Sequence, residues 1–247
     1  ITGILTNSGT IGNTTTAGGT ADRGLLVTGS SSDIVGGVNN SGTIKGVNAA
    51  IEVQASAAIS GGITNSGLIG DVTNSADGIN VNGGTVGSKS GTGISNTGTG
   101  VIAGSNAGIL VDSDGSVLGG ISNGSSATIT GGSIGLYVSS ASVTGGVDND
   151  GLLFGATTGL NVSGTTSTIS GVVDNSGTIS GAAAAINVNG TSAALLGGIV
   201  NSGTIYGTAS AIIVAGGGDI AGITNSGQIG VSTSGTNYAD TAAILVT

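Results

Sequence analysis

The sequence predicts an all-β protein, a three-sided parallel β-solenoid of about nine coils with about 26 residues in each. Three observations support this fold class. An Asn-Ser-Gly motif returns along the whole chain, an Ile-x-Val pattern follows each copy, and 53 of the 247 residues are Gly. Self-similarity with a period of this length is the sequence signature of a repeat architecture.

The Asn of the motif defines the repeat. Successive copies are separated by 33, 25, 31, 27, 26, 26, 26 and 24 residues. Six copies keep Asn-Ser-Gly intact, and three are altered to Asn-Thr-Gly, Asn-Gly-Ser and Asn-Asp-Gly. We expect the nine side chains to stack as a ladder of amides, which consists of Asn7, Asn40, Asn65, Asn96, Asn123, Asn149, Asn175, Asn201 and Asn225.

Each repeat predicts three short strands. The unit reads I-x-G-G-[IV]-x-N-S-G-T-I-x-G and, after a variable stretch, [AG]-[IL]-x-V. In Ile-x-Val the outer two side chains share one face and the middle one points away, as in a strand. Ile and Val favour strands, whereas recurrent Gly disfavours helices. The expected strands are I-x, then [IV]-x-N with T-I-x across a turn, then I-x-V.

The Gly-Gly and Asn-Ser-Gly segments predict the bends, because Gly and Asn tolerate positive φ. A unit of this size cannot bury its own apolar face, so each unit must stack on its neighbours. We expect one coil per unit, with Ile and Val pointing inward in register. Nine coils at about 4.8 Å per coil would form a rod about 43 Å long.

Composition excludes several classes of function. The net charge is −9 with only three Lys and Arg, so we expect no nucleic-acid partner and no docking on anionic membranes. The chain has no Cys for disulfides and no His, the usual general base. No apolar run approaches the roughly 18–20 residues of a membrane span, so no direct membrane insertion is expected.

The repeats cover residues 1–247, which we interpret as a single repetitive segment. Because the chain begins with Ile1 and contains no Met, we expect a processed product or part of a longer chain. The first and last units resemble interior units and lack the polar caps that solenoids need. We therefore expect either an interior slice of a longer chain or a filament in which the last coil stacks on the first coil of another copy.

Two outward aromatic residues form a candidate ligand-binding surface. Phe154 and Tyr206 occupy the same position of the repeat, after the T-I pair, two coils apart. The coil rise places them about 9–10 Å from each other on one face. They could form a platform for sugar rings, or they could be two unrelated exposed aromatics.

Two carboxylates form the candidate acidic site. Asp148 and Asp174 precede the repeat Asn in adjacent coils, so stacking brings them to roughly 5 Å. This spacing suits a glycosidase acid and nucleophile, and a Ca²⁺ ion could also bridge the pair. The alternative is two solvated turn residues, because no His or nearby cation supports catalysis. We predict no catalytic residue and, apart from this Ca²⁺, no cofactor.

The repeat style resembles the passenger regions of bacterial autotransporters and related large surface adhesins. The likeness is clearest in GGITNSGLIG (61–70), GVVDNSGTISGAAAAINVNG (171–190) and GGIVNSGTIYGTASAIIVAGG (197–217). It implies a β-helix, usually right-handed, that is secreted to the bacterial cell surface. It implies no binding residue.

Two functions remain open. The first is a structural or adhesive surface protein that forms a rigid rod, stalk or filament, with other copies, adjoining coils, surface glycans or other cells as partners. The alternative is a carbohydrate-active β-helix enzyme, a lyase or hydrolase, or a polysaccharide-binding module. Such enzymes wall a cleft with long loops. The longest departures here, 12–24 and 82–93, are small and polar, which favours the structural, non-enzymatic function.

Overall fold

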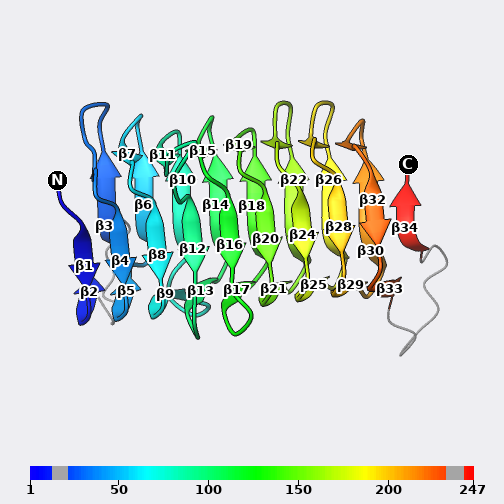
Figure 1. Ribbon diagram of the computed structural model, residues 1–247, viewed down its shortest axis with the longest axis horizontal. Helices are drawn as coiled ribbons and strands as arrows, with labels where there is room; N and C mark the ends of the chain where they lie inside the picture. The colour runs from blue at the N-terminus through cyan, green and yellow to red at the C-terminus, as the bar shows by residue number, and fades with distance from the viewer. Residues whose placement is uncertain (13–21, 232–241) are drawn as a thin grey trace.

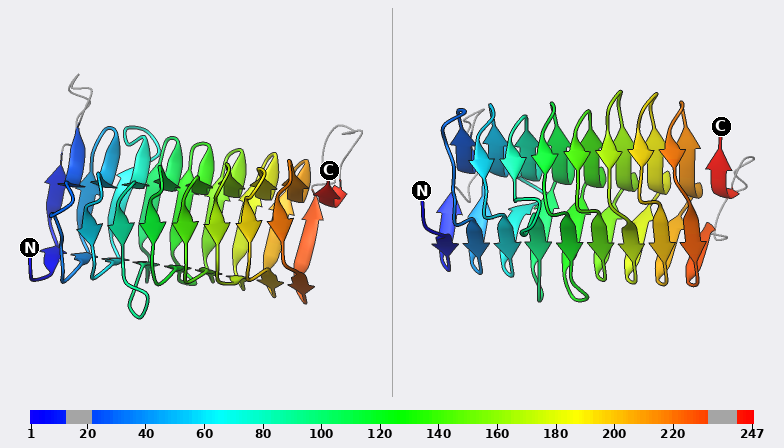
Figure 2. Two further views of the ribbon diagram at one scale, coloured as in Figure 1. Left: turned by 90° about the horizontal axis from the view of Figure 1, so that it is seen from above. Right: turned by 45° about the horizontal axis from the view of Figure 1, so that its top comes forward.

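A computed structural model describes residues 1–12, 22–231 and 242–247, and within these ranges it contains strands and turns but no helix. Figure 1 shows the coils side by side along the longest axis, with the two chain ends at opposite ends of the rod. The turned views in Figure 2 show the strands of successive coils aligned in layers. The protein is a parallel β-solenoid, so the fold class that the repeat predicts is confirmed.

Two sheets contain the strands on either side of the Asn-Ser-Gly bend. Sheet A stacks, in this order, β1 (Leu5–Asn7), β4 (Val38–Asn40), β8 (Ile63–Asn65), β12 (Ile94–Asn96), β16 (Ile121–Asn123), β20 (Val147–Asn149), β24 (Val173–Asn175), β28 (Ile199–Asn201) and β32 (Ile223–Asn225). Sheet B stacks β2 (Thr10–Gly12), β5 (Thr43–Lys45), β9 (Leu68–Asp71), β13 (Val101–Gly104), β17 (Thr128–Gly131), β21 (Leu152–Gly155), β25 (Thr178–Gly181), β29 (Thr204–Gly207) and β33 (Gln228–Val231).

The other two sheets contain the longest and the shortest strands. Sheet C stacks β3 (Arg23–Thr28), β6 (Ala49–Gln54), β10 (Asp77–Asn82), β14 (Ala107–Asp112), β18 (Ile134–Ser139), β22 (Thr158–Ser163), β26 (Ala184–Asn189), β30 (Ser210–Ala215) and β34 (Ala242–Val246). Sheet D stacks β7 (Ala58–Ile59), β11 (Thr85–Val86), β15 (Ser116–Val117), β19 (Ser142–Val143), β23 (Thr168–Ile169), β27 (Ala194–Leu195) and β31 (Asp219–Ile220).

Each complete coil has four strands, whereas the sequence predicts three. The predicted pair [IV]-x-N and T-I-x divides at the Asn-Ser-Gly bend, and its halves lie in sheets A and B. The cause is the Asn amide, which folds back over the bend: Asn40 Nδ2 lies 3.2 Å from the carbonyl oxygen of Gly42. This contact closes a tight turn, so the two segments face different directions.

The inward residues of sheet C show how the core is built. Ile79 pairs with Ile109 and Val81 with Val111 in parallel register, and all four side chains are fully buried. The same positions carry Ile, Leu or Val in the neighbouring coils, so aliphatic side chains stack in columns along the rod. Burial of apolar surface stabilises such columns by roughly 25 cal/mol per Å².

The middle residue of the Ile-x-Val pattern points away from the core. Asn80, Leu110 and Tyr137 are partly exposed, although both neighbours of each are buried. Glu52 is the exception, because it is only 4 % exposed and forms an ion pair with Arg23. The inward and outward faces therefore follow the period of two that the sequence predicts.

Gly recurs where chain segments approach closely. A Cβ on Gly78 would lie 2.5 Å from the carbonyl oxygen of Gly108 and 2.9 Å from Cγ2 of Ile102, at the corner between sheets B and C. Gly62, before sheet A, has φ +79°, a conformation that residues with a side chain rarely adopt. These corners explain why Gly precedes Ile-x-Val in coils such as that of Gly78 and why Gly-Gly precedes many strands of sheet A.

The 31-residue repeat between Asn65 and Asn96 has its extra length in two turns. Residues 72–76 connect β9 to β10, and residues 87–93 connect β11 to β12. The sequence predicts the second insertion but not the first. Of the other long stretch, 12–24, residues 13–21 lie outside the described residues. Nowhere in the described ranges is there a helix of the length and apolar character needed to cross a membrane.

Candidate functional site

The Asn side chains at the end of each sheet A strand form one column. Nδ2 of each Asn donates a hydrogen bond to Oδ1 of the Asn in the next coil, at 2.7–3.0 Å, from Asn7 through to Asn225. Eight of the nine side chains are at most 5 % exposed, and only Asn225 is exposed. The column is therefore a buried, continuous amide ladder.

Each amide of the ladder also satisfies backbone groups. Asn149 Nδ2 lies 3.2 Å from the carbonyl oxygen of Gly151 in its own bend and 3.1 Å from that of Thr178 in the next coil. The side chain thus joins sheet A to sheet B and one coil to the next. All the Nδ2 groups point toward the C-terminal end, so the ladder has a direction. Its chemistry is structural, since an amide that is buried and fully hydrogen-bonded has no free group for catalysis.

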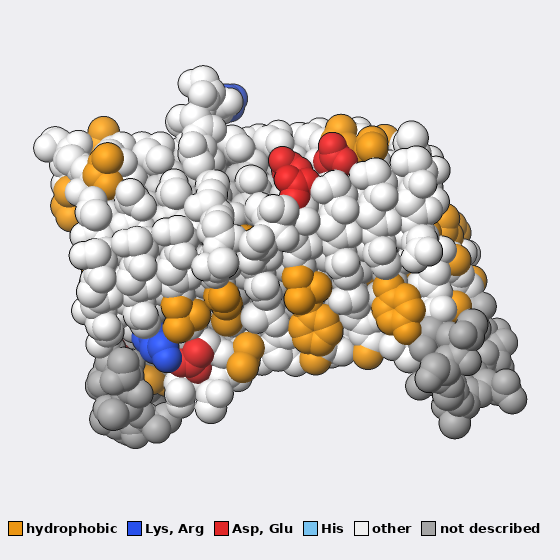
Figure 3. Space-filling model, turned by 60° about the horizontal axis from the view of Figure 1, so that its bottom comes forward, with side chains coloured by type: hydrophobic (Ala, Val, Ile, Leu, Met, Phe, Trp, Pro, Cys, Tyr) orange, Lys and Arg blue, Asp and Glu red, His pale blue; other side chains and the backbone are white. Residues whose placement is uncertain are grey.

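The predicted aromatic pair lies on the outer face of sheet B. Phe154 in β21 pairs with Ser180 in β25, and Ser180 pairs with Tyr206 in β29. The two rings are thus two strands apart on one face, and their side chains are 37 % and 38 % exposed. Figure 3 shows hydrophobic side chains spaced along this side of the rod.

The predicted carboxylates lie side by side on the outer face of sheet A. Asp148 in β20 pairs in register with Asp174 in β24, and both are exposed. Partial burial, followed by the nearby charges of Asp150 and Asp174, raises the pKa of the Asp148 carboxyl above its ordinary value. Asp150 is itself hydrogen-bonded by Ser176 Oγ from the next coil. The three carboxylates form a small negatively charged patch.

A shallow hollow of about 490 Å³ lies beside this patch and is lined by Asp148, Asp174, Val172 and the glycines of the adjoining corner. Among the described residues, no three Asp, Glu, His or Cys side chains converge so that they could hold a metal ion. Ca²⁺ prefers six to eight oxygen ligands. Among the described residues, no third acidic side chain therefore converges with Asp148 and Asp174 on the predicted Ca²⁺ site.

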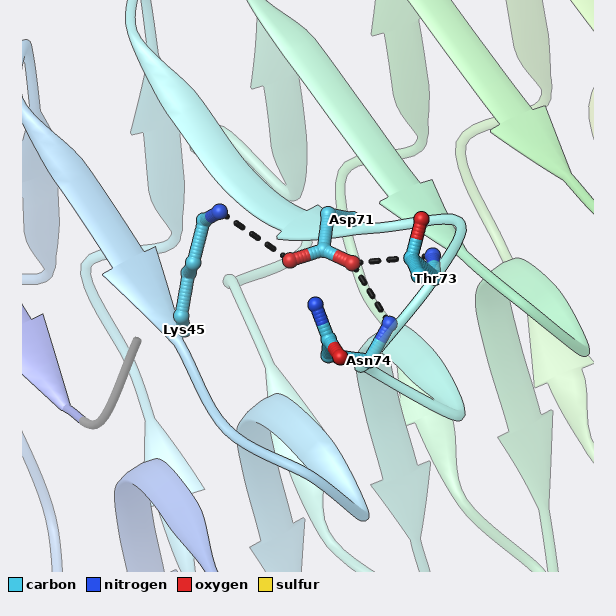
Figure 4. Close-up of polar contacts among 4 residues, drawn as sticks. All are labelled: Lys45, Asp71, Thr73 and Asn74. Carbon is cyan, nitrogen blue, oxygen red and sulfur yellow. Dashed lines mark hydrogen bonds and ion pairs between the residues drawn. The ribbon is translucent and has the colours of Figure 1, made fainter. Parts of the chain in front are cut away.

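The structure adds a polar turn that sequence reasoning missed. Asp71 Oδ1 accepts hydrogen bonds from the backbone N–H groups of Thr73 (2.8 Å) and Asn74 (2.6 Å), and Oδ2 lies 3.0 Å from Lys45 Nζ (Figure 4). Burial alone would raise the pKa of Asp71, but these hydrogen bonds lower it below its ordinary value. The sequence does contain a signal for this turn, because Asp71 breaks the repeat. The last residue of each of the next five strands of sheet B is Gly, whereas β9 ends on Asp71.

Sheet C contains a second group of acids that the sequence did not single out. Asp77 is only 6 % exposed and accepts hydrogen bonds from Asn106 Nδ2 (2.9 Å) and the Ala107 N–H (3.2 Å). Burial outweighs these bonds and, together with the charges of Asp112 and Glu52, raises the pKa of Asp77 to about 6. Burial and the charge of Glu52 also raise the pKa of Asp112. The repeat fixes the register positions of these residues, but it gives no sign that Asp77 is buried or that the three carboxylates influence one another.

Comparison of the chain with protein-family models, with curated proteins and with solved structures finds no match. The class that the structure defines is the parallel β-solenoid, and the function must be argued from its surface and its ladders.

Proposed function

We propose that the chain is a rigid rod segment of a structural or adhesive protein on the outside of a bacterial cell, and that it is not an enzyme. Its partners would be further coils, other copies of the chain, or ligands on surrounding surfaces. The likeness of its repeats to autotransporter passengers supports the extracellular location.

The unbroken amide ladder is the observation that carries this proposal. Eight consecutive Asn–Asn hydrogen bonds cross the eight junctions between nine coils, and sheets A, B and C cross the same junctions. Bending the rod would open one side of a junction and leave buried amide groups unpaired, at a cost of about 1–3 kcal/mol for each group. A structure of this kind is suited to holding its ends at a fixed separation.

Spin-label distances test the rigidity directly, because the chain has no Cys to compete for the label. Thr6 in β1 and Thr224 in β32 are exposed and occupy equivalent register positions of sheet A, eight strand spacings apart. In the variant with Thr6→Cys and Thr224→Cys we expect a single narrow distance distribution near 38 Å. The shorter pair Asn39→Cys and Val200→Cys should give about 29 Å. A broad distribution for the long pair would contradict the proposal.

A carbohydrate-active function is the second candidate, and the acidic pair in its hollow is the observation that favours it. Carboxylates about 5 Å apart suit a retaining glycosidase, and a raised pKa suits its general acid. The purified chain should be incubated with a panel of neutral and acidic polysaccharides, and new reducing ends measured. If the chain cleaves a polysaccharide and both Asp148→Asn and Asp174→Asn abolish the activity, the chain is an enzyme and the proposed structural function is wrong. Absence of cleavage agrees with the structural function.

A further inference from the structure

The outer face of sheet B at strands β21, β25 and β29 combines two aromatic rings with free hydroxyl groups. Phe154 and Tyr206 lie on alternate strands of this face and are each more than a third exposed. Two strand spacings separate them by about 9–10 Å along the rod axis. This distance is about the length of two sugar residues in an extended polysaccharide chain.

The residues around the two rings can form hydrogen bonds. Thr178, Ser180 and Thr204 are partly exposed, and Ser180 occupies the register position between the rings. Within the described part of the chain, the side-chain hydroxyls of these three residues form no hydrogen bond with other residues. They are therefore available to a ligand that carries many hydroxyl groups.

The same face is uncharged. The strands β21, β25 and β29 contain no Asp, Glu, Lys or Arg. On β5 and β9 of the same sheet, Lys45 and Asp71 neutralise each other in an ion pair. A surface of aromatic rings and hydroxyls without charge matches a neutral sugar, since the apolar face of a sugar ring packs on an aromatic ring while its hydroxyls need polar partners.

We propose that this face binds a linear neutral polysaccharide that lies along the rod axis. One sugar ring stacks on Phe154, the ring two residues further along stacks on Tyr206, and the sugar between them forms hydrogen bonds with Ser180 and its Thr neighbours. This inference rests on the adhesive part of the proposed function and gives it a ligand class.

Calorimetric titration of the purified chain with cellohexaose and mannohexaose tests the proposal. We expect binding of at least one of them, a loss of affinity of at least tenfold in Phe154→Ala and in Tyr206→Ala, and retained binding in Tyr206→Phe. Val200→Ala on sheet A is the matched control, because Val200 is also exposed (39 %) and should leave binding unchanged. A hexamer of galacturonic acid, which is charged, should not bind.

The spacing of the rings is tested by moving one of them without changing composition. The double variant Phe154→Ser with Ser180→Phe places the two aromatic residues on adjacent strands, and we expect it to lose at least tenfold in affinity. Equal affinity in this variant, equal loss in Val200→Ala, or no binding of either neutral hexasaccharide would overturn the inference. The spin-label distances distinguish a failure of this inference from a failure of the proposed function. If they are unchanged in the same preparations, the rigid rod is confirmed even where polysaccharide binding is absent.

Discussion

Each Asn of the repeat donates and accepts hydrogen bonds in the same buried place. An Asp side chain would lack the donor, and a Leu of similar size would lack both groups. Asn149 uses its amide group for the next Asn and for two carbonyl oxygens, while its own oxygen accepts from Asn123. The requirement is the same in every coil, which is why the residue could be recognised from the sequence alone.

Replacing one member of the ladder should be costly. Asn149→Ala leaves the Asn123 amide and the Asn175 oxygen without a side-chain partner in a buried column, so we expect a loss of about 2–4 kcal/mol in the free energy of unfolding. Denaturant-induced unfolding followed by circular dichroism measures it. Asn161→Ala on sheet C is the control, since Asn161 is partly exposed and its side chain forms a single hydrogen bond with Asn187. Similar losses in both variants would show that the ladder has no special role.

Asp77 should make stability depend on pH. Its pKa is about 6 in the fold, above the ordinary value of 3.8, so the folded state keeps a proton that the unfolded chain releases. The stabilisation that this protonated carboxyl contributes is fully present below about pH 3.8 and is lost as the pH rises through about 6. It amounts to at most about 3 kcal/mol. Asp77→Asn keeps the acceptor for Asn106 and should therefore raise the free energy of unfolding at pH 7 but not at pH 4.

Asp71→Asn supplies the control of opposite sign. The pKa of Asp71 is lowered in the fold, so its contribution is present at neutral pH and is lost on acidification. This variant should be less stable than the parent at pH 7. If Asp77→Asn also destabilises the chain at pH 7, the claim that a buried, charged Asp77 destabilises the fold is wrong.

At the scale of the strand and the coil, the sequence carries the alternation of inward and outward residues but not the shape of the corners. The period of two in Ile-x-Val is local, and it predicts correctly that Ile109 is buried and Leu110 points outward. The division into four strands depends on an amide that folds over its own bend, a contact that no periodicity encodes. The turn at residues 72–76 was missed for a similar reason, because Asp71 creates it through hydrogen bonds to the turn itself.

Neighbouring positions of one strand should respond differently to the same substitution. Ile109→Asn places an unpaired amide in a fully buried column and removes apolar contacts, so we expect a loss of about 3 kcal/mol or more. Leu110→Asn should cost less than about 1 kcal/mol, because the equivalent residues of nearby coils are Asn80 and Asn161. Thermal unfolding monitored by calorimetry compares the two. Equal effects would contradict the assignment of the faces.

At the scale of the whole molecule, every coil is built on the coil before it, through parallel register in the sheets and through the amide ladder. The sequence could predict this arrangement because the repeat spans nearly the whole chain. It could also place the aromatic pair and the acidic pair, since register follows from the repeat. It could not indicate the environment of Asp77 or the Lys45–Asp71 turn, because both depend on residues that depart from the repeat.

The central claim is that the coils are equivalent units that add length. One, two or three further copies of residues 150–175, inserted after Asn175, should each add one coil. With spin labels at the positions of Thr6 and Thr224, we expect the mean distance to rise from about 38 Å by about 4.8 Å per copy, with the distribution remaining narrow. An insertion of residues 150–162, half a coil, should broaden the distribution, because it breaks the register. A distance that does not grow with whole coils, or grows equally with half a coil, would contradict the account.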